Sequence, residues 1–173
     1  MYMNDFISQM KLEESIAHAN HIANVDSLTG LLNRRGFFAE LNAGWQELVD
    51  RNTLVCVAIY DIDFFKAYND HYGHLAGDDC ICRVSGTLQD YFEDHEGLLC
   101  RFGGEEFLAF FIPRDAAGAF EIVAGARKQI EALQIDGVTE ISGTSHVTIS
   151  AGYITAHAAG KDSEELIHQA DLA

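Results

Sequence analysis

Asp61 and Asp63 end a run of apolar residues and are the first candidates for chemistry in this sequence. A carboxylate at the end of a buried strand is held rigidly. Two carboxylates with one residue between them can share a hard cation, helped by a backbone carbonyl such as that of Ile62. Such a pair is more often only the solvated end of a strand. The motif therefore predicts a cation site only if a second acidic group comes close to it.

A second acidic pair, Glu105 and Glu106, directly follows Gly103 and Gly104. Acidic residues at a turn are usually just solvated, but glycines in this position let a phosphate group approach the backbone closely. If the two acidic pairs lie on neighbouring strands, Asp61 and Glu105 would face one metal ion. Together they predict a site where a divalent cation mediates contact with phosphates.

Three further polar residues, Lys66, Asn69 and Asp78, follow the first acidic pair. Lysine is scarce in this chain, so Lys66 is a candidate phosphate contact. Asn and Asp side chains offer the donors and acceptors that match the edge of a guanine base. Taken singly, residues of these types are more often helix caps or surface positions, so their functional interpretation depends on the neighbouring motifs.

The pattern of apolar residues predicts the elements that position these groups. The run 53–60 is apolar and rich in β-branched residues, which suits a central strand covered on both faces. Residues 98–112 predict a β-hairpin whose two glycines supply positive φ, and its apolar arms indicate a central place in the sheet. We also expect a strand at 146–155 and helices at 4–23, about 35–50 and 115–134. A further helix is expected to end near residue 92, and a last one to begin near residue 162. The mixture predicts an α+β fold, a single sheet with antiparallel strands flanked by helices.

The helix expected at residues 4–23 has a narrow apolar stripe of Leu12, Ile16, Ala19 and Ala23. This spacing is typical of a coiled coil or a dimer contact. A helix packed on its own domain explains it equally well.

Composition excludes several classes of function. The chain has 173 residues, 48% of them hydrophobic, with Lys+Arg 11 and Asp+Glu 27, a net charge of −16. This charge argues against binding a nucleic-acid polymer or an anionic membrane directly. No run of about 18 apolar residues and no secretory signal is present, so we expect a cytoplasmic protein without a membrane segment. The four cysteines, which we expect to be reduced thiols, are Cys56, Cys80, Cys82 and Cys100.

Taken together, three motifs resemble those of the GGDEF family, the diguanylate cyclases. Residues 103–107 read GGEEF, residues 26–35 read DSLTGLLNRR, similar to the DxLTGLxNRR of the family, and residues 61–78 are similar to its second long motif. The resemblance runs from residue 26 to about residue 172. It implies a central sheet like that of nucleotidyl cyclases and the polymerase palm.

The resemblance also implies a reaction. Family members condense two GTP molecules into cyclic di-GMP and two pyrophosphates, with two Mg²⁺ or Mn²⁺ ions in each active site. Each domain holds one GTP, so a second copy of the domain is the implied partner. The resemblance implies that residues 1–24 form a signalling or linker helix. An upstream sensory domain, which this sequence lacks, would control the pair of domains.

The roles implied for individual residues are these. Asp61, Glu105 and the carbonyl of Ile62 would hold the metal, with Asp61, Glu105 and Lys66 as catalytic residues. The implied nucleotide-binding residues are Asn69 and Asp78 for guanine, Lys66 and the backbone at Phe64 and Phe65 for phosphates, and Gly103 and Gly104 for space. Glu106 would support the loop.

Two departures from the family pattern change these expectations. The inhibitory product site RxxD corresponds to Asp94 and Gly97 here, so we expect no product inhibition through it. The family's LYxAKxxGRN segment is absent from this sequence, so we expect a domain 25–173 that is shortened at its C-terminus and binds phosphate more weakly. A non-catalytic module that binds GTP is the alternative function, and a hetero-dinucleotide synthase is less favoured because Asp78 is present.

Overall fold

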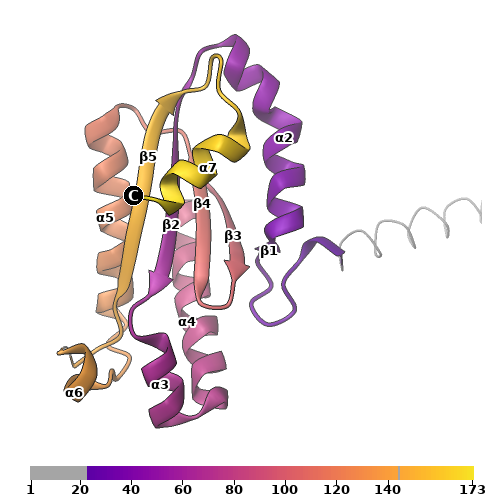
Figure 1. The fold of residues 1–173 in the computed structure, drawn as a ribbon. Coiled ribbons are helices and arrows are strands. Elements are labelled where there is room, and N and C mark those ends of the chain that lie inside the picture. The colour runs from indigo at the N-terminus through magenta and orange to yellow at the C-terminus, as the bar shows by residue number, and fades with distance from the viewer. Residues whose placement is uncertain (1–22, 144) are drawn as a thin grey trace, which may run out of the picture.

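A five-stranded sheet forms the centre of the molecule in the computed structural model, which describes residues 23–143 and 145–173 (Figure 1). The strands are β1 (Leu32–Asn33), β2 (Leu54–Ile62), β3 (Leu98–Gly103), β4 (Glu106–Phe111) and β5 (Ile149–His157). The helices are α2 (Arg34–Asp50), α3 (Phe65–Tyr72), α4 (His74–Glu93), α5 (Ala116–Ala132), α6 (Thr139–Ser142) and α7 (Ser163–Asp171).

The strand order across the sheet is β1-β3-β4-β2-β5. β2 pairs antiparallel with both β4 and β5, β3 pairs antiparallel with β4, and the short β1 pairs parallel with β3. The sheet is therefore mixed and mostly antiparallel, which confirms the predicted α+β fold. The hairpin of β3 and β4 lies inside the sheet, as its apolar arms predicted.

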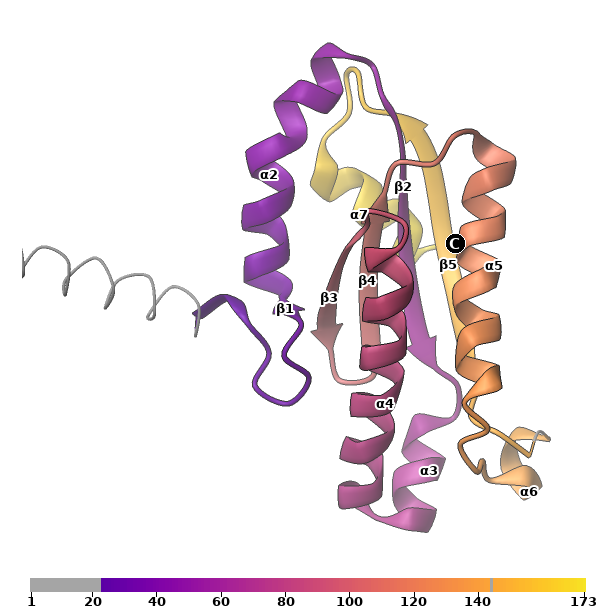
Figure 2. The same cartoon turned by 180° about the vertical axis from the view of Figure 1, so that it is seen from behind.

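Helices cover both faces of the sheet. α4 and α5 lie on one face, and α2 and α7 lie on the other (Figures 1 and 2). Successive residues of β2 alternate between the two cores: Ala58 and Tyr60 pack on the α4 side, while Val57 and Ile59 pack on the α2 side. This burial on both faces explains why the strand is apolar without interruption.

Three features differ from the sequence prediction. β2 continues through Asp61 and Ile62, because Ile62 pairs with Ile149 of β5, so Asp61 lies within the strand rather than after it. α3 is not among the helices expected from the sequence, but Phe65 is buried in the core and holds this short helix in place. The predicted helix at 4–23 falls outside the described residues, except for Ala23.

All four cysteines are free thiols, and Cys56, Cys80 and Cys100 are buried. Burial raises the pKa of Cys56 and Cys100 to about 12, which keeps these thiols protonated and unreactive. No helix in the described residues is long and apolar enough to cross a bilayer.

Candidate active site

The end of β2 and the tip of the β3–β4 hairpin lie side by side. In the antiparallel ladder Asp61 is directly opposite Glu106, and Glu105 precedes Glu106 in the turn. The pairing of hairpin and strand on which the predicted cation site depended is therefore present. It brings Asp61 close to both glutamates, which come from a segment more than forty residues further along the chain.

The turn itself leaves open space. Gly104 has φ +53°, in the left-handed region, whereas Gly103 ends β3 without positive φ, so the expectation that both glycines supply positive φ is correct only for Gly104. A Cβ atom built on either glycine would meet no atom within 4 Å. The described residues thus leave room beside the hairpin tip for a bound group.

The charge at this site is not neutralised by neighbouring side chains. Burial, together with the negative charges of Glu105, Glu106 and Asp63, raises the pKa of Asp61 to about 6. Among the described residues, none of the three side chains Asp61, Glu105 and Glu106 forms an ion pair. Carboxylate oxygens with uncompensated negative charge fit a hard divalent cation.

The number of side-chain ligands is small. In the part of the chain that the structure describes, no three His, Cys, Asp or Glu residues gather in a group that could hold a metal. A cation beside Asp61 and Glu105 would therefore need main-chain oxygens, such as that of Ile62, and oxygens of its own ligand. A phosphate group supplies such oxygens, as Mg²⁺ sites in nucleotide enzymes usually require.

Asp63, two residues after Asp61, is engaged by two hydroxyl groups. Its two carboxylate oxygens accept hydrogen bonds from the hydroxyls of Thr148 and Ser150, both at 2.6 Å. Asp63 is thus engaged by residues beside and within β5, and a cation shared by Asp61 and Asp63 stays a prediction. The sequence had no signal for this contact, since it depends on the pairing of β2 with β5.

The N-terminus of α3 follows β2 directly and offers free amide groups. Phe64, the residue before α3, has φ +57° and does not cap the helix with its side chain. The amides of Phe64, Phe65 and Lys66 donate to no acceptor in the described residues, and the first turn contains no acidic side chain. Free amides at a helix N-terminus, with the exposed Lys66 beside them, suit a phosphate group.

Asn69 and Asp78 lie on α3 and on the first turns of α4. Gly77 is buried between the two helices, and a Cβ atom there would collide with Oδ1 of Asn69. Gly77 therefore allows α4 to approach Asn69 closely. Asp78, whose carboxylate is predicted to bind guanine, directly follows Gly77 in α4. The sequence showed Gly77 within a motif but did not indicate this role.

A family model described as "Diguanylate cyclase, GGDEF domain" matches residues 23–173. The chain belongs to the GGDEF family. It is 32% identical over 172 residues to the diguanylate cyclase DgcM of Escherichia coli K12, covering 99% of this chain and 39% of that protein. It is 34% identical over 166 residues to the diguanylate cyclase VdcA of Vibrio cholerae, covering 93% and 46%. The chain thus spans less than half the length of these two relatives.

Solved GGDEF structures have the same fold. The coiled coil and GGDEF domain of DgcB from Caulobacter crescentus, in complex with c-di-GMP, gives a TM-score of 0.84 at 25% identity and covers 98% of this chain and 88% of that chain. The active GGEEF domain of a diguanylate cyclase from Vibrio cholerae gives a TM-score of 0.70 at 26% identity, covering 83% and 88%.

In this GGDEF domain the hairpin is anchored to the segment before β1. Nη1 of Arg101 lies 3.1 Å from Oδ1 of Asp26, and its Nε donates to the carbonyl of Gly104 at 2.9 Å. Burial acts to raise the pKa of Asp26, but hydrogen bonds from Thr29 and Arg101 outweigh it and hold the pKa below its usual value. The sequence indicated no role for either Asp26 or Arg101.

Proposed function

We propose that this domain is a diguanylate cyclase, which condenses two GTP molecules into cyclic di-GMP and releases two pyrophosphates across a dimer of domains. The observation that carries the proposal is the arrangement at the end of β2. Asp61 lies beside the hairpin tip with Glu105, and the free amides at the start of α3 follow three residues later. One strand end thus offers ligands for a cation and donors for phosphates. The GGDEF relatives named as diguanylate cyclases support the same reaction.

Asp61, Glu105 and the carbonyl of Ile62 are the residues that would hold Mg²⁺ or Mn²⁺. The cation would lower the pKa of the attacking hydroxyl and neutralise charge on the leaving pyrophosphate. The amides of Phe64 and Phe65 bind and orient the phosphate groups.

The other side chains position the nucleotide. Lys66 contributes a positive charge to the phosphates, and Asn69 and Asp78 bind the guanine edge. The open space at Gly103 and Gly104 admits the nucleotide, while Glu106 supports the hairpin.

In each half of the reaction, the 3′-hydroxyl of one GTP attacks the α-phosphorus of the other. The new P–O bond forms as the bond between the α-phosphorus and the oxygen that bridges to the β-phosphate breaks. Pyrophosphate leaves with that electron pair, and the proton of the hydroxyl is released to water. Each domain holds one GTP, so two domains must face each other for both bonds to form. Catalysis then depends on the proximity and orientation that the dimer provides.

The test is an assay of the purified chain with GTP and Mg²⁺, measuring pyrophosphate and cyclic di-GMP. We expect Asp61→Ala and Glu105→Ala each to lower the rate at least about a hundred-fold, whereas Glu121→Ala, on an exposed turn of α5, leaves it unchanged. Equal rates in the wild type and both site variants would show that the metal assignment is wrong. GTP binding without any turnover in the dimeric protein would instead identify a non-catalytic GTP-binding module.

A further inference from the structure

An open hollow lies on the far side of the hairpin from Asp61. It has a volume of about 450 Å³ and is bordered by Arg34, Arg35 and Arg101, by Asp26, and by Gly103 and Gly104 of the turn. We call it the arginine hollow. Because β4 lies between β3 and β2, the hairpin separates this hollow from the acidic site at the end of β2. One hairpin tip thus has a negative site on one side and a positive site on the other.

The positive charge of the hollow is unusual for this chain. The chain has only 11 Lys and Arg residues and a net charge of −16, yet three arginines border this hollow and Asp26 is the one carboxylate among its lining residues. Arg34 and Arg35 also occupy the first turn of α2, where the helix dipole is positive and added cations are unfavourable. Neither forms an ion pair within the described residues. An arrangement of this kind is stabilised when an anion binds.

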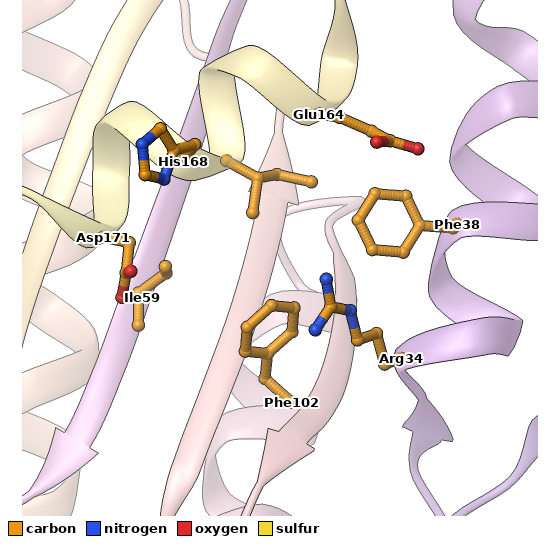
Figure 3. A pocket seen from close by; sticks show the side chains of 8 residues that line it. Arg34, Phe38, Ile59, Phe102, Glu164, His168 and Asp171 are labelled. Atoms are coloured by element: carbon orange, nitrogen blue, oxygen red, sulfur yellow. The ribbon is translucent and has the colours of Figure 1, made fainter.

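Two of the three guanidinium groups are held in place. The guanidinium of Arg34 lies 4.7 Å from the ring centre of Phe102 and 5.8 Å from that of Phe38 (Figure 3). Glu164 of α7 lines the adjoining pocket but does not pair with Arg34. Arg101 is fixed by its bonds to Asp26 and the turn. Guanidinium groups that are already oriented bind phosphate oxygens with little loss of side-chain entropy.

We propose that the arginine hollow binds the phosphate groups of a guanine nucleotide. The condensation needs a second triphosphate close to the hairpin, and the acidic side of the tip is already assigned to the domain's own GTP. The second nucleotide is either bound to the other domain of the dimer or taken up from solution. Its identity rests on the proposed function, but the binding of phosphate to the hollow does not.

The first experiment tests phosphate binding without metal or turnover. Pyrophosphate is titrated calorimetrically into the full chain in the presence of EDTA. We expect Arg34→Gln/Arg35→Gln to weaken binding at least about ten-fold, and Arg35→Gln alone, which leaves the stacked Arg34 in place, to weaken it severalfold. Arg51→Gln, a change just after the other end of α2, keeps the wild-type affinity.

No binding of pyrophosphate to the wild type, or full binding to the double arginine variant, overturns the proposal. Because the titration contains neither GTP nor Mg²⁺, a protein without cyclase activity gives the same answer. Failure of the proposed function and failure of this inference are therefore distinguishable.

The second experiment separates the two sources of the nucleotide. Sedimentation and nucleotide binding are measured with Mg²⁺ and a GTP analogue that cannot be condensed. If the partner domain carries the nucleotide, the double arginine variant binds the analogue but no longer dimerises in its presence. If the nucleotide is free, the variant still dimerises but loses one bound equivalent per domain. A variant that matches the wild type in both dimerisation and stoichiometry overturns the proposal.

Discussion

Asp61 in β2 lies directly across the antiparallel ladder from Glu106 in β4. Like charges opposite each other in a sheet are destabilising, and burial adds to this cost at Asp61. The fold keeps an unfavourable acidic pair where a cation would make it favourable. Stability and proposed function therefore oppose each other at this position.

We expect Asp61→Asn to stabilise the metal-free domain. The pKa of Asp61 is raised from 3.8 to about 6 in the folded state, so its stabilising contribution is complete below 3.8 and is lost as the pH rises through 6. At pH 7.5 the variant should gain about 1 kcal/mol in free energy of unfolding, after allowance for solvent screening. The gain should shrink between pH 7.5 and pH 5.

Urea denaturation at both pH values in EDTA measures the gain in stability, with Glu93→Gln, an exposed change on α4, as the control. A variant less stable than the wild type at pH 7.5 would contradict this account.

We expect Mg²⁺ to stabilise the wild type only through the acidic site. A ligand at about a hundred times its dissociation constant adds about 2.7 kcal/mol, which corresponds to several degrees in Tm for a domain of this size. Asp61→Asn and Glu105→Gln should lose most of this shift, as measured by thermal unfolding with MgCl₂ and with EDTA. An equal shift in all three proteins would place the stabilising ion elsewhere.

We expect Gly77→Ala to weaken GTP binding. The new methyl group would collide with Oδ1 of Asn69 and displace either that side chain or α4. A loss of one charged or neutral hydrogen bond to the base corresponds to about ten-fold in affinity. Calorimetry with a GTP analogue measures it.

The matched control is Gly86→Ala, in the same helix at an exposed position with open space around its Cβ. It should leave GTP affinity unchanged and stabilise the helix by about 0.5–1 kcal/mol. If both variants bind GTP as the wild type does, Gly77 has no part in placing Asn69.

We expect Asp26 and Arg101 to be energetically coupled. Their side chains are only 23% and 16% exposed, so the ion pair is better shielded than a surface pair. A double-mutant cycle of Asp26→Asn and Arg101→Gln should give a coupling of about 1–2 kcal/mol in the free energy of unfolding. The exposed pair Arg51–Glu47, at 72% and 64%, should give under about 0.5 kcal/mol. Coupling no larger than in this exposed pair would mean that the hairpin is not anchored there.

We expect cyclic di-GMP not to inhibit the domain through the position of the family's RxxD site. Asp94 stands where the arginine would be, and Gly97 stands where the aspartate would be. A Cβ atom at Gly97 would lie 2.9 Å from Cδ1 of Phe92, so the backbone here is packed too closely for an aspartate without movement. Initial rates measured with added product should stay constant. Tight product binding that is abolished by Asp94→Ala would contradict the expectation.

Local sequence pattern was sufficient for much of the fold. The uninterrupted apolar run of β2, the glycine turn of the hairpin and the helical periodicity of α2 and α5 each reflect one element's own burial or turn chemistry. The acidic residues of the site were also visible, because carboxylates at strand ends and glycine turns carry a chemical meaning of their own. α3 was missed because it has only eight residues and depends on the burial of Phe65.

Contacts between distant segments depended on packing. The engagement of Asp63 by Thr148 spans 85 residues, and the pairing of Asp26 with Arg101 spans 75. Such partners are set by strand register and by how segments dock, and a shift of one residue in register would point each side chain to the opposite face. Periodicity along the chain records which face of an element is buried, but not which element covers it, so only the folded sheet placed Asp61 beside the hairpin and Asp63 against Thr148 and Ser150.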